Sequence, residues 1–596
     1  MQPLPASLPV PVELCVGQRE LSEPRLSPDG SLLGWMTSRA GMTVLVVLDL
    51  DTSAKRSYVL EAGLRAARSM GGGAWDWTPD ATAVIAVGGD GDLWRLPVGG
   101  GAPSRECSTG EGRAASSPSV SLVEGFGTVT VFVVDQAEVW ACDGIRTWRL
   151  DDATADFVAD PCLVGDRVWW TAWDVPAMPW DAARLVSVAL DGSDRRVIEG
   201  DGTVQQPRAH PDGRLSYVRD DTGWNNVWLD GAPVVVEPVE HAGPAWGPGA
   251  RTFAWSPDGT RLAFTRNECG FGRLCLWSAE GVREIGRGVH GQVSWRGSRI
   301  AALRSGARTP TEVIVVDTTT WERAVVDVGP DAAWGERRER MPEPDAWSIG
   351  SVHARVYPAD PGRPARGALV WLHGGPTDQW QVAFMPRVEY WRSRGWHVVV
   401  PDHRGSTGHG RAYTQALRGR WGELDVDDTI TVIEAVHERG LADPASTVVL
   451  GGSAGGFTAL ESVCRRPDLM AGVAVAYPVT DLADLSVRSH RFEAHYTVGL
   501  VGPLPETRAL HEARSPVRHP ERIGGVPVLI LHGDTDPVVP VDHSRAFVAA
   551  ARAAGADVTL HEYPGEGHGF RDVAHQRDEY LRIGAFLDRV VPARQG

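Results

Sequence analysis

Short apolar runs separated by turn signals fill residues 20–335, with almost no helical periodicity. One turn phrase recurs, and in three of its four copies Pro-Asp-Gly precedes an apolar run. The copies lie at 27–30, 78–80, 210–213 and 256–259. Because proline presets φ and glycine supplies a positive φ, each copy predicts a tight turn that leads into a strand.

These strand units recur at a regular interval. They begin near residues 27, 77, 119, 162, 210, 255 and 294, a mean spacing of about 44 residues, which is the length of a four-stranded propeller blade. The alternative is a stack of β-sandwich domains, but sandwiches do not require equal spacing. The first half is therefore predicted to be an all-β propeller with seven blades.

The pattern changes after a charged, proline-containing stretch at 336–344. Continuous apolar runs then alternate with helix-like segments, which predicts a parallel sheet buried on both faces. The runs are 368–372, 397–400, 447–450, 473–476 and 528–531, and the helix-like segments include 428–439, 544–554 and 578–590. We expect an N-terminal extension at 1–19, a β-propeller at 20–335, a linker at 336–350 and one α/β domain at 351–596.

Composition narrows the class of protein. With 42% apolar and 23% charged residues, the 596-residue chain is typical of a folded protein. Its net charge of −17 argues against nucleic acid and anionic membranes as partners. The seven cysteines are scattered and never spaced C-x-x-C, so neither a disulfide framework nor a zinc site is expected. No apolar run approaches 18 residues and no signal peptide is recognisable, which favours a cytoplasmic protein.

A glycine-flanked serine follows the third apolar run. In Gly451-Gly452-Ser453-Ala454-Gly455 the strand 447–450 comes before and a helix-like segment after. Glycines two before and two after the serine permit the strained strand-to-helix turn that exposes its hydroxyl. Ser453 is therefore the predicted nucleophile.

A serine hydroxyl needs a base, and the base needs a carboxylate to orient it. The expected chain order is Ser, Asp, His, with both partners at the carboxyl ends of strands. His568 lies on a glycine-flanked loop after strand 557–560 and is the predicted base. Asp534 and Asp536 both follow strand 528–531, and position alone does not separate them. The remaining histidines near these strands, His532, His543 and His561, are interpreted as structural or surface residues.

The tetrahedral intermediate of acyl transfer also needs hydrogen-bond donors for its oxyanion. The backbone N–H of Ala454, next after the nucleophile, is one candidate. The other is expected in His373-Gly374-Gly375-Pro376, where the lack of a Cβ lets an N–H approach the substrate. Gly375 is preferred over Gly374. No metal ligands or phosphate-cradling loop are recognisable, so no metal or cofactor is predicted.

Several phrases in this order resemble the prolyl oligopeptidase family of serine peptidases, in particular its acylaminoacyl-peptidase and dipeptidyl aminopeptidase-like branch. Members of this family carry an N-terminal propeller and a C-terminal α/β-hydrolase domain, so the resemblance spans nearly the whole chain. Its catalytic aspartate stands four residues before a proline, which here implies Asp536, with Pro540. The matching phrases are 373–376, 402–410, 421–428, 451–456, 514–516, 532–536 and 567–570.

The resemblance also implies a substrate pocket after strand 473–476. Tyr477, Phe492 and Tyr496 would make it aromatic, and Glu493 would be placed to receive a substrate amine; ordinary core aromatics and a solvated glutamate are the alternatives. The chain departs from the family in two respects. Ala454 stands where relatives often have tyrosine, histidine or asparagine, and no Glu-Glu dipeptide is present to clamp a free amine.

The function expected from these features is that of a serine peptidase. It would hydrolyse short peptides or acyl-peptides near their N-terminus through an acyl-enzyme, while the propeller restricts access to large substrates. The resemblance also makes a homo-oligomer an expectation. Two alternatives stay open: an esterase, amidase or acyl transferase that acts on a small metabolite, and a propeller scaffold with an inactive hydrolase domain.

Overall fold

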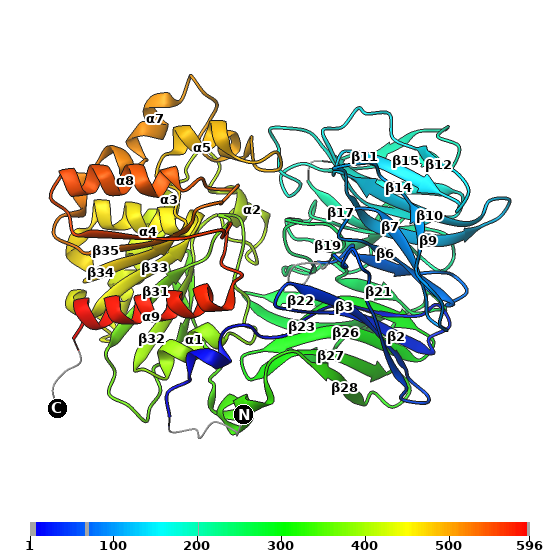
Figure 1. The fold of residues 1–596 in the computed structure, drawn as a ribbon, viewed down its shortest axis with the longest axis horizontal. Helices are drawn as coiled ribbons and strands as arrows, with labels where there is room; N and C mark the ends of the chain where they lie inside the picture. Colours follow the sequence, from blue (N-terminus) through cyan, green and yellow to red (C-terminus); the bar gives the residue numbers. More distant parts are fainter. Residues whose placement is uncertain (1–7, 66–70, 201, 593–596) are drawn as a thin grey trace. The chain divides into compact units, whose positions relative to one another are not determined.

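The computed structural model describes residues 8–65, 71–200 and 202–592 (Figure 1). The chain separates into two compact units. One comprises Arg19–Pro330 and Gln381–Phe384, and the other comprises the described parts of Met1–Gln18, Asp331–Trp380 and Met385–Gly596. Residues 1–7 of the predicted extension and 593–596 of the predicted catalytic domain lie outside the described residues.

The first unit is the predicted propeller, and its blade number of seven is confirmed. Each blade is a four-stranded antiparallel sheet made of consecutive strands. Blade 1 comprises β1 Glu20–Leu26, β2 Leu32–Arg39, β3 Met42–Asp49 and β4 Lys55–Tyr58. Blade 2 comprises β5 Trp75–Trp77, β6 Ala83–Val87, β7 Leu93–Pro97 and β8 Ser104–Cys107. Blade 3 comprises β9 Ala115–Val123, β10 Gly127–Val134, β11 Glu138–Cys142 and β12 Thr147–Arg149. Blade 4 comprises β13 Phe157–Val164, β14 Arg167–Trp173, β15 Arg184–Ala189 and β16 Arg196–Ile198, and blade 5 comprises β17 Val204–Ala209, β18 Leu215–Arg219, β19 Asn226–Leu229 and β20 Ala232–Pro233. Blade 6 comprises β21 Phe253–Trp255, β22 Leu262–Glu268, β23 Phe271–Ser278 and β24 Gly281–Arg287. Blade 7 comprises β25 Val289–Arg296, β26 Arg299–Gly306, β27 Thr309–Asp317 and β28 Arg323–Val328.

The recurring turn joins the first and second strands of a blade, and each blade begins two to seven residues before the predicted start. In blade 1, Gly30 N–H donates to the Ser27 carbonyl (2.8 Å) and Ser27 N–H to the Leu32 carbonyl (2.9 Å). The turn therefore closes the hairpin between β1 and β2. The sequence marked this turn strongly, whereas the strand before it has no comparable signal.

The first strands carry an irregularity that repeats between blades. In five of them a polar residue has a positive φ of 50–56°, in each case at a register shift against the second strand. These residues are Glu23, Ser117, Asp160, Gln206 and Gln292. All five side chains are buried.

Hydrogen bonds link these buried side chains to other blades. Glu23 accepts from Gly73 N–H (2.9 Å), and Gln292 donates to the Gly249 carbonyl (2.8 Å). Asp160 accepts from Gly249 N–H (2.6 Å) and from the Ser117 hydroxyl (3.1 Å). The inner ends of the blades are therefore joined by a buried polar network, which we call the hub.

The second unit contains one eight-stranded sheet with the order β29-β30-β32-β31-β33-β34-β35-β36. β29 and β30 are antiparallel to their neighbours, and the pairs from β32 to β36 are parallel. The α/β-hydrolase fold predicted for this half is confirmed. The strands are β29 Asp345–Ile349, β30 Val352–Tyr357, β31 Gly367–Leu372, β32 Trp396–Asp402, β33 Thr447–Gly452, β34 Gly472–Ala476, β35 Val528–Gly533 and β36 Val558–Tyr563.

Helices cover both faces of this sheet (Figure 1). Residues of α3, α4 and α8 pack with the strands in one apolar cluster, and residues of α1 and α9 pack in the other. The central strands contribute to both clusters, as expected for runs without alternation. The helices are α1 Pro386–Arg392, α2 Arg411–Gln415, α3 Leu424–Glu438, α4 Ala454–Arg465, α5 Leu482–Arg488, α6 Tyr496–Leu500, α7 Arg508–Ala513, α8 Asp542–Ala553 and α9 Val573–Val590.

Two segments predicted to lie outside the domains belong to this second unit. Val10 N–H donates to the Ser393 hydroxyl (3.0 Å), so the described part of the extension packs against the hydrolase. The predicted linker contains β29 and most of a 3-10 segment, Ala332–Arg340. Within this charged stretch, Arg337 is buried and donates to the Glu389 carboxylate (2.7 Å). Pairing with a distant residue, which the local sequence does not reveal, allows this charge to be buried.

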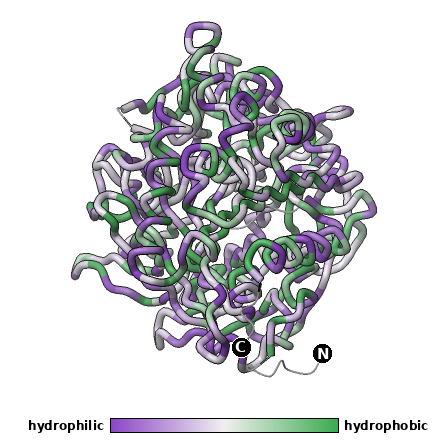
Figure 2. Tube along the Cα trace, turned by 90° about the vertical axis from the view of Figure 1, so that its left-hand side faces the viewer, coloured by the Kyte–Doolittle hydropathy of each residue, from purple (hydrophilic) through white to green (hydrophobic). Residues whose placement is uncertain are grey.

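Hydropathy varies over short distances along the whole chain (Figure 2). Within the described ranges, no helix combines the length and apolar character needed to cross a bilayer.

Candidate active site

Ser453 lies between β33 and α4 with φ 56° and ψ −123°, a strained conformation for a residue other than glycine. The glycines around it permit close packing. A Cβ on Gly455 would lie 2.4 Å from the His373 carbonyl oxygen, and one on Gly451 would lie 2.3 Å from the Gly455 carbonyl oxygen. Both substitutions would push the helix away from the sheet. The motif therefore forms the predicted strand-to-helix turn.

A second strained residue lies beside this turn. Among the described residues of the hydrolase unit, Ser453 and Tyr477 are the two non-glycine residues with positive φ. Tyr477 follows β34, and its ring centroid is 4.5 Å from that of His568. A Cβ on Gly452 would lie 3.2 Å from Tyr477 Cε2. Tyr477 thus contacts the serine turn on one side and His568 on the other.

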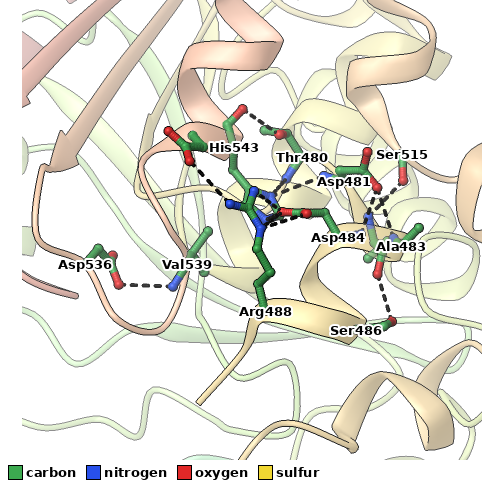
Figure 3. Close-up of polar contacts among 12 residues, drawn as sticks. Thr480, Asp481, Ala483, Asp484, Ser486, Arg488, Ser515, Asp536, Val539 and His543 are labelled. Carbon is green, nitrogen blue, oxygen red and sulfur yellow. Dashed lines mark hydrogen bonds and ion pairs between the residues drawn. The ribbon is translucent and has the colours of Figure 1, made fainter.

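His568 pairs with the aspartate that the family resemblance favoured. Its Nδ1 lies 2.7 Å from Asp536 Oδ2. Asp536 Oδ1 accepts hydrogen bonds from Val538 N–H (2.8 Å) and Val539 N–H (3.0 Å; Figure 3). Burial would raise the pKa of Asp536, but hydrogen bonds from His532 and His568 hold it below its ordinary value. The carboxylate stays ionised. Asp534 instead accepts from Gly565 N–H (2.6 Å) and braces the neighbouring turn.

His532, interpreted from the sequence as structural or surface, lies directly behind Asp536. It is fully buried, with Nε2 2.9 Å from the Val539 carbonyl oxygen and 3.5 Å from Asp536 Oδ2. Its Nδ1 is 2.7 Å from the Ser544 hydroxyl oxygen. Since a carbonyl only accepts, Nε2 carries the proton and Nδ1 accepts from Ser544. No local signal in the sequence marks this contact, because it forms only when the loop to Val539 folds back.

A polar cluster fixes the far end of the loop that carries Asp536 (Figure 3). His543, near the start of α8, donates its N–H to the Pro540 carbonyl (2.9 Å), and its Nε2 lies 3.0 Å from Asp484 Oδ2. Its carbonyl accepts from the Thr480 hydroxyl (2.8 Å). The loop is therefore tied to α8 and, through it, to the segment around α5.

The predicted oxyanion loop lies next to Ser453. A Cβ on Gly374 would lie 3.7 Å from Ser453 Cβ. Ala454 is the first residue of α4, so its N–H has no acceptor within the helix. His373 is fully buried, its Nε2 lies 2.7 Å from the Ser406 hydroxyl oxygen, and burial lowers its pKa to about 3. A neutral His373 anchors the loop, while the donor roles of Gly375 and Ala454 stay predictions.

The other predicted pocket residues lie in two places. Tyr496 is buried, donates its hydroxyl hydrogen to Thr377 Oγ1 (2.6 Å) and accepts from Thr377 N–H (3.2 Å), so it braces the oxyanion loop. Glu493 Oε1 is 3.4 Å from His490 Nε2, and the Phe492 ring centroid is 6.5 Å from that of His490. These two residues form a local group with His490, and their place in a pocket stays a prediction.

One carboxylate on the oxyanion loop was not singled out from the sequence. Asp378 is half-buried, and a Cβ on Gly375 would lie 3.2 Å from its Cβ. Its Oδ1 accepts from Gln379 N–H (2.8 Å). Burial raises the pKa of Asp378 to about 6. No local motif marks this residue, because its perturbation results from the folding of the loop.

An α/β sheet that carries a strained serine turn and a His–Asp pair at the carboxyl ends of its strands defines the class of serine hydrolases. The sequence profile of the prolyl oligopeptidase family matches residues 382–593. The family resemblance predicted from the motifs is therefore confirmed for this part of the chain.

Individual relatives agree with this assignment. The acylamino-acid-releasing enzyme of Arabidopsis thaliana is 28% identical over 228 residues, which cover 37% of this chain and 29% of that protein. Dipeptidyl peptidase family member 6 of Caenorhabditis elegans is 30% identical over 228 residues, covering 37% and 30%. These alignments span less than a third of either relative's length. A solved puromycin-hydrolyzing peptidase of Mycobacterium tuberculosis is 27% identical, covers 99% of this chain and 98% of its own, and has a TM-score of 0.86.

Proposed function

We propose that this protein is a serine peptidase that hydrolyses short peptides, or amides that resemble them, near their amino end. The observation that carries the proposal is the pairing of His568 with Asp536 beside the strained Ser453 turn, with Tyr477 in contact with both. Strain at an exposed nucleophile is typical of this reaction class.

In the proposed reaction, His568 Nε2 accepts the Ser453 hydroxyl proton as Oγ attacks the scissile carbonyl carbon. Asp536 holds the proton on Nδ1, keeps the imidazole in the required tautomer and stabilises the imidazolium. His568 then gives its proton to the departing amine, which leaves an acyl group on Ser453. A water molecule, deprotonated by the same histidine, attacks this ester and releases the acid product.

The negative charge on the tetrahedral intermediate needs donors that are already in place. We assign this role to the N–H groups of Gly375 and Ala454. The first helical residue offers an N–H that no helix carbonyl uses. The anchoring of the loop by His373 and Tyr496 supports the assignment of Gly375.

The relatives suggest which substrates to test. The names of the aligned proteins include acylamino-acid-releasing enzymes, and a puromycin hydrolase mutant was solved in complex with PGG at 27% identity over 99% of this chain. These names differ in whether a blocked or a free amino terminus is expected. Exclusion of folded proteins by the propeller, a cytoplasmic location and self-association are further parts of the proposal.

The test is mass-spectrometric analysis of a short-peptide library offered in free and N-acetylated forms, with the Ser453→Ala protein as the blank. Release of the acetylated first residue would identify an acylaminoacyl-peptidase. Preference for free termini would identify an aminopeptidase or dipeptidyl-peptidase, and would make Asp378 and Glu493 the carboxylates to change next.

A matched series of ester substrates distinguishes the alternative. An esterase, amidase or acyl transferase acting on a small metabolite would cleave or transfer simple acyl groups while leaving every peptide intact. That result would refute the peptidase proposal, as would peptide cleavage that the Ser453→Ala protein retains in full. Cleavage of large native proteins as fast as short peptides would refute size selection alone.

A further inference from the structure

The loop that carries His568 contains a buried carboxylate that has no part in the proposed reaction. Glu566 precedes His568 by two residues and is 5% exposed. Within residues 564–575 it is the one buried residue, and residues 571–574 are exposed. A carboxylate is costly to bury unless its oxygens accept hydrogen bonds, so its partners show what it holds in place.

Three donors that follow His568 in the chain converge on this carboxylate. The Arg571 N–H donates to Oε2 (2.9 Å), and the Asp572 N–H donates to Oε1 (2.8 Å). Nδ1 of His575, the third residue of α9, lies 2.9 Å from Oε1. Since an ionised carboxylate only accepts, Nδ1 of His575 carries the proton. The Glu566 side chain therefore joins the His568 loop to the start of α9.

Burial does not neutralise this carboxylate. It would raise the pKa of Glu566, but the three hydrogen bonds hold the pKa below its ordinary value. Hydrogen bonds to an ionised acceptor are roughly twice as strong as those between neutral groups. The loop is thus closed by charge-assisted bonds, which an uncharged side chain of the same length does not fully replace.

The main chain of Glu566 holds the neighbouring loop. Its carbonyl accepts from the N–H (3.0 Å) and from the hydroxyl (2.9 Å) of Thr535, the residue before Asp536. A Cβ on Gly533 would lie 2.3 Å from the same carbonyl oxygen, so the two loops are in direct contact. One residue therefore ties the Asp536 loop, the His568 loop and α9 to one another.

His568 lies between these two attachments. The carbonyl of Glu566 is fixed two residues before it, and the carboxylate fixes the chain three and four residues after it. Asp536 Oδ2, 2.7 Å from Nδ1, sets one side of the imidazole ring. The closed loop sets the backbone that carries the ring. A misplacement of about 1 Å in an active site can cost about 100-fold in rate.

We propose that Glu566 is a positioning residue of the active site, which closes the loop so that His568 Nε2 faces the Ser453 hydroxyl. Glu566 takes no part in proton transfer and acts through the backbone of the loop. The inference rests on the proposed function, because it takes His568 as the base.

The first test is steady-state hydrolysis of the best library peptide. Glu566→Ala removes all three bonds to the loop and should lower kcat about 100-fold. KM should change less than about 3-fold, because the bonds of the carboxylate end on residues 571–575, outside the predicted pocket. Glu566→Gln keeps one oxygen acceptor and should restore part of the rate, for a loss of about 10-fold.

Two controls separate positioning from a loss of stability. Asp572→Ala removes the side-chain cap of α9, where Oδ1 accepts from Ala574 N–H (2.7 Å), but keeps the main-chain bond to Glu566. It should lower the unfolding midpoint and leave kcat unchanged. Glu562→Gln alters a half-buried carboxylate on β36 that is paired with Arg545, and it should leave kcat unchanged. A kcat loss in Asp572→Ala as large as that in Glu566→Ala would overturn the proposal.

A second readout follows from the proton that His568 gives to the leaving group. The amine of a peptide needs this proton, whereas p-nitrophenolate departs without it. A displaced imidazole should therefore cost Glu566→Ala more activity with the peptide than with a p-nitrophenyl ester of the same acyl group. An equal loss with both substrates, or a kcat equal to that of the parent, would overturn the proposal.

Hydrogen-exchange mass spectrometry tests the loop without relying on activity. The segment 565–572 should exchange faster in Glu566→Ala than in the parent or in Glu562→Gln. If the parent hydrolysed none of the substrates, the proposed function would fail, while faster exchange would still support the closure of the loop by Glu566. Exchange of this segment at the rate of the parent would overturn the positioning role.

Discussion

The two units both hold side chains in the left-handed region of φ, but they use this strain differently. In the propeller, five first strands repeat it at a buried polar residue, and the hydrogen bonds described for Glu23, Ser117 and Asp160 link one blade to another. In the hydrolase unit, the two described non-glycine cases, Ser453 and Tyr477, lie against one another's turns at the edge of the sheet. Repeated strain lies where the blades are joined, whereas the strain confined to one place lies at the proposed nucleophile.

Replacing the nucleophile gives the largest expected effect and separates these two kinds of strain. Ser453→Ala and Ser453→Gly should both lower kcat by about a million-fold, the order seen when a triad serine is removed. Ser453→Gly should in addition raise stability by about 1–2 kcal/mol, because glycine adopts φ 56° without strain. The measurements are hydrolysis of the best library peptide and thermal unfolding.

The propeller supplies the matched control for this experiment. Ser117 has nearly the same φ, 51°, but its hydroxyl donates to Asp160 inside the hub. Ser117→Gly should leave kcat unchanged, and the relief of strain should be offset by the lost hydrogen bond. If Ser117→Gly stabilised the protein as much as Ser453→Gly, the distinction between structural and functional strain would fail.

The second-largest expected effect follows from a change at Asp536, the proposed orienting carboxylate. Asp536→Asn keeps the shape of the side chain but favours the wrong tautomer of His568, so kcat should fall about 10,000-fold. The fold should persist, because Val538 and Val539 still find an oxygen acceptor. Asp534→Asn, two residues away on the same loop, is the control. An equal loss of activity in Asp534→Asn would reverse the assignment of the two aspartates.

In the propeller, a substitution at a strained residue should change the free energy of unfolding rather than the rate of hydrolysis. Glu23→Gln removes one charge of a buried pair and leaves Arg25 partly unpaired, which should cost about 3 kcal/mol. Asp51→Asn removes an exposed carboxylate that is paired with Arg299, and it should cost no more than about 0.5 kcal/mol. Denaturant unfolding followed by tryptophan fluorescence measures both. An equal loss in the free energy of unfolding in both variants would contradict the view that the hub joins the blades.

A buried carboxyl group on α4 should make the stability of the protein depend on pH. Glu461 lies on α4, its Oε1 has no partner among the described residues, and burial raises its pKa to about 8. Between about pH 4.5 and 8 the unfolded chain therefore holds fewer protons than the folded one, and stability falls as pH rises.

Glu461→Gln removes the titrating carboxyl group and therefore this pH dependence. The glutamine side chain carries no charge that has to be buried. The variant should gain stability over the parent at pH 8 and much less at pH 5, because the parent's carboxyl group loses its favourable protonated form as the pH rises. Thermal unfolding at the two pH values checks this. The same midpoint difference at both pH values would show that the carboxyl group titrates normally.

The sequence predicted much of this architecture, for identifiable reasons. The apolar run 368–372 became β31 Gly367–Leu372 because a strand buried on both faces needs apolar residues at every position. The Ser453 turn was recognisable because its glycines are required locally, by contacts as short as 2.3 Å. The contact of His532 with Asp536 was missed, since it arises only when the loop to Val539 folds back.

By itself, the sequence determined most elements of both units, the blade repeat and the turn that carries Ser453. These depend on periodicity, turn residues and glycines, which act over a few neighbouring positions. The tertiary structure decided which charges are paired. Arg25 meets Asp76 from the next blade, while Arg251 has no acid partner among the described residues and its Nε is buried without a hydrogen-bond partner. Charge pairing depends on segments that only folding brings together, because the Coulomb energy follows distance in space and the local dielectric.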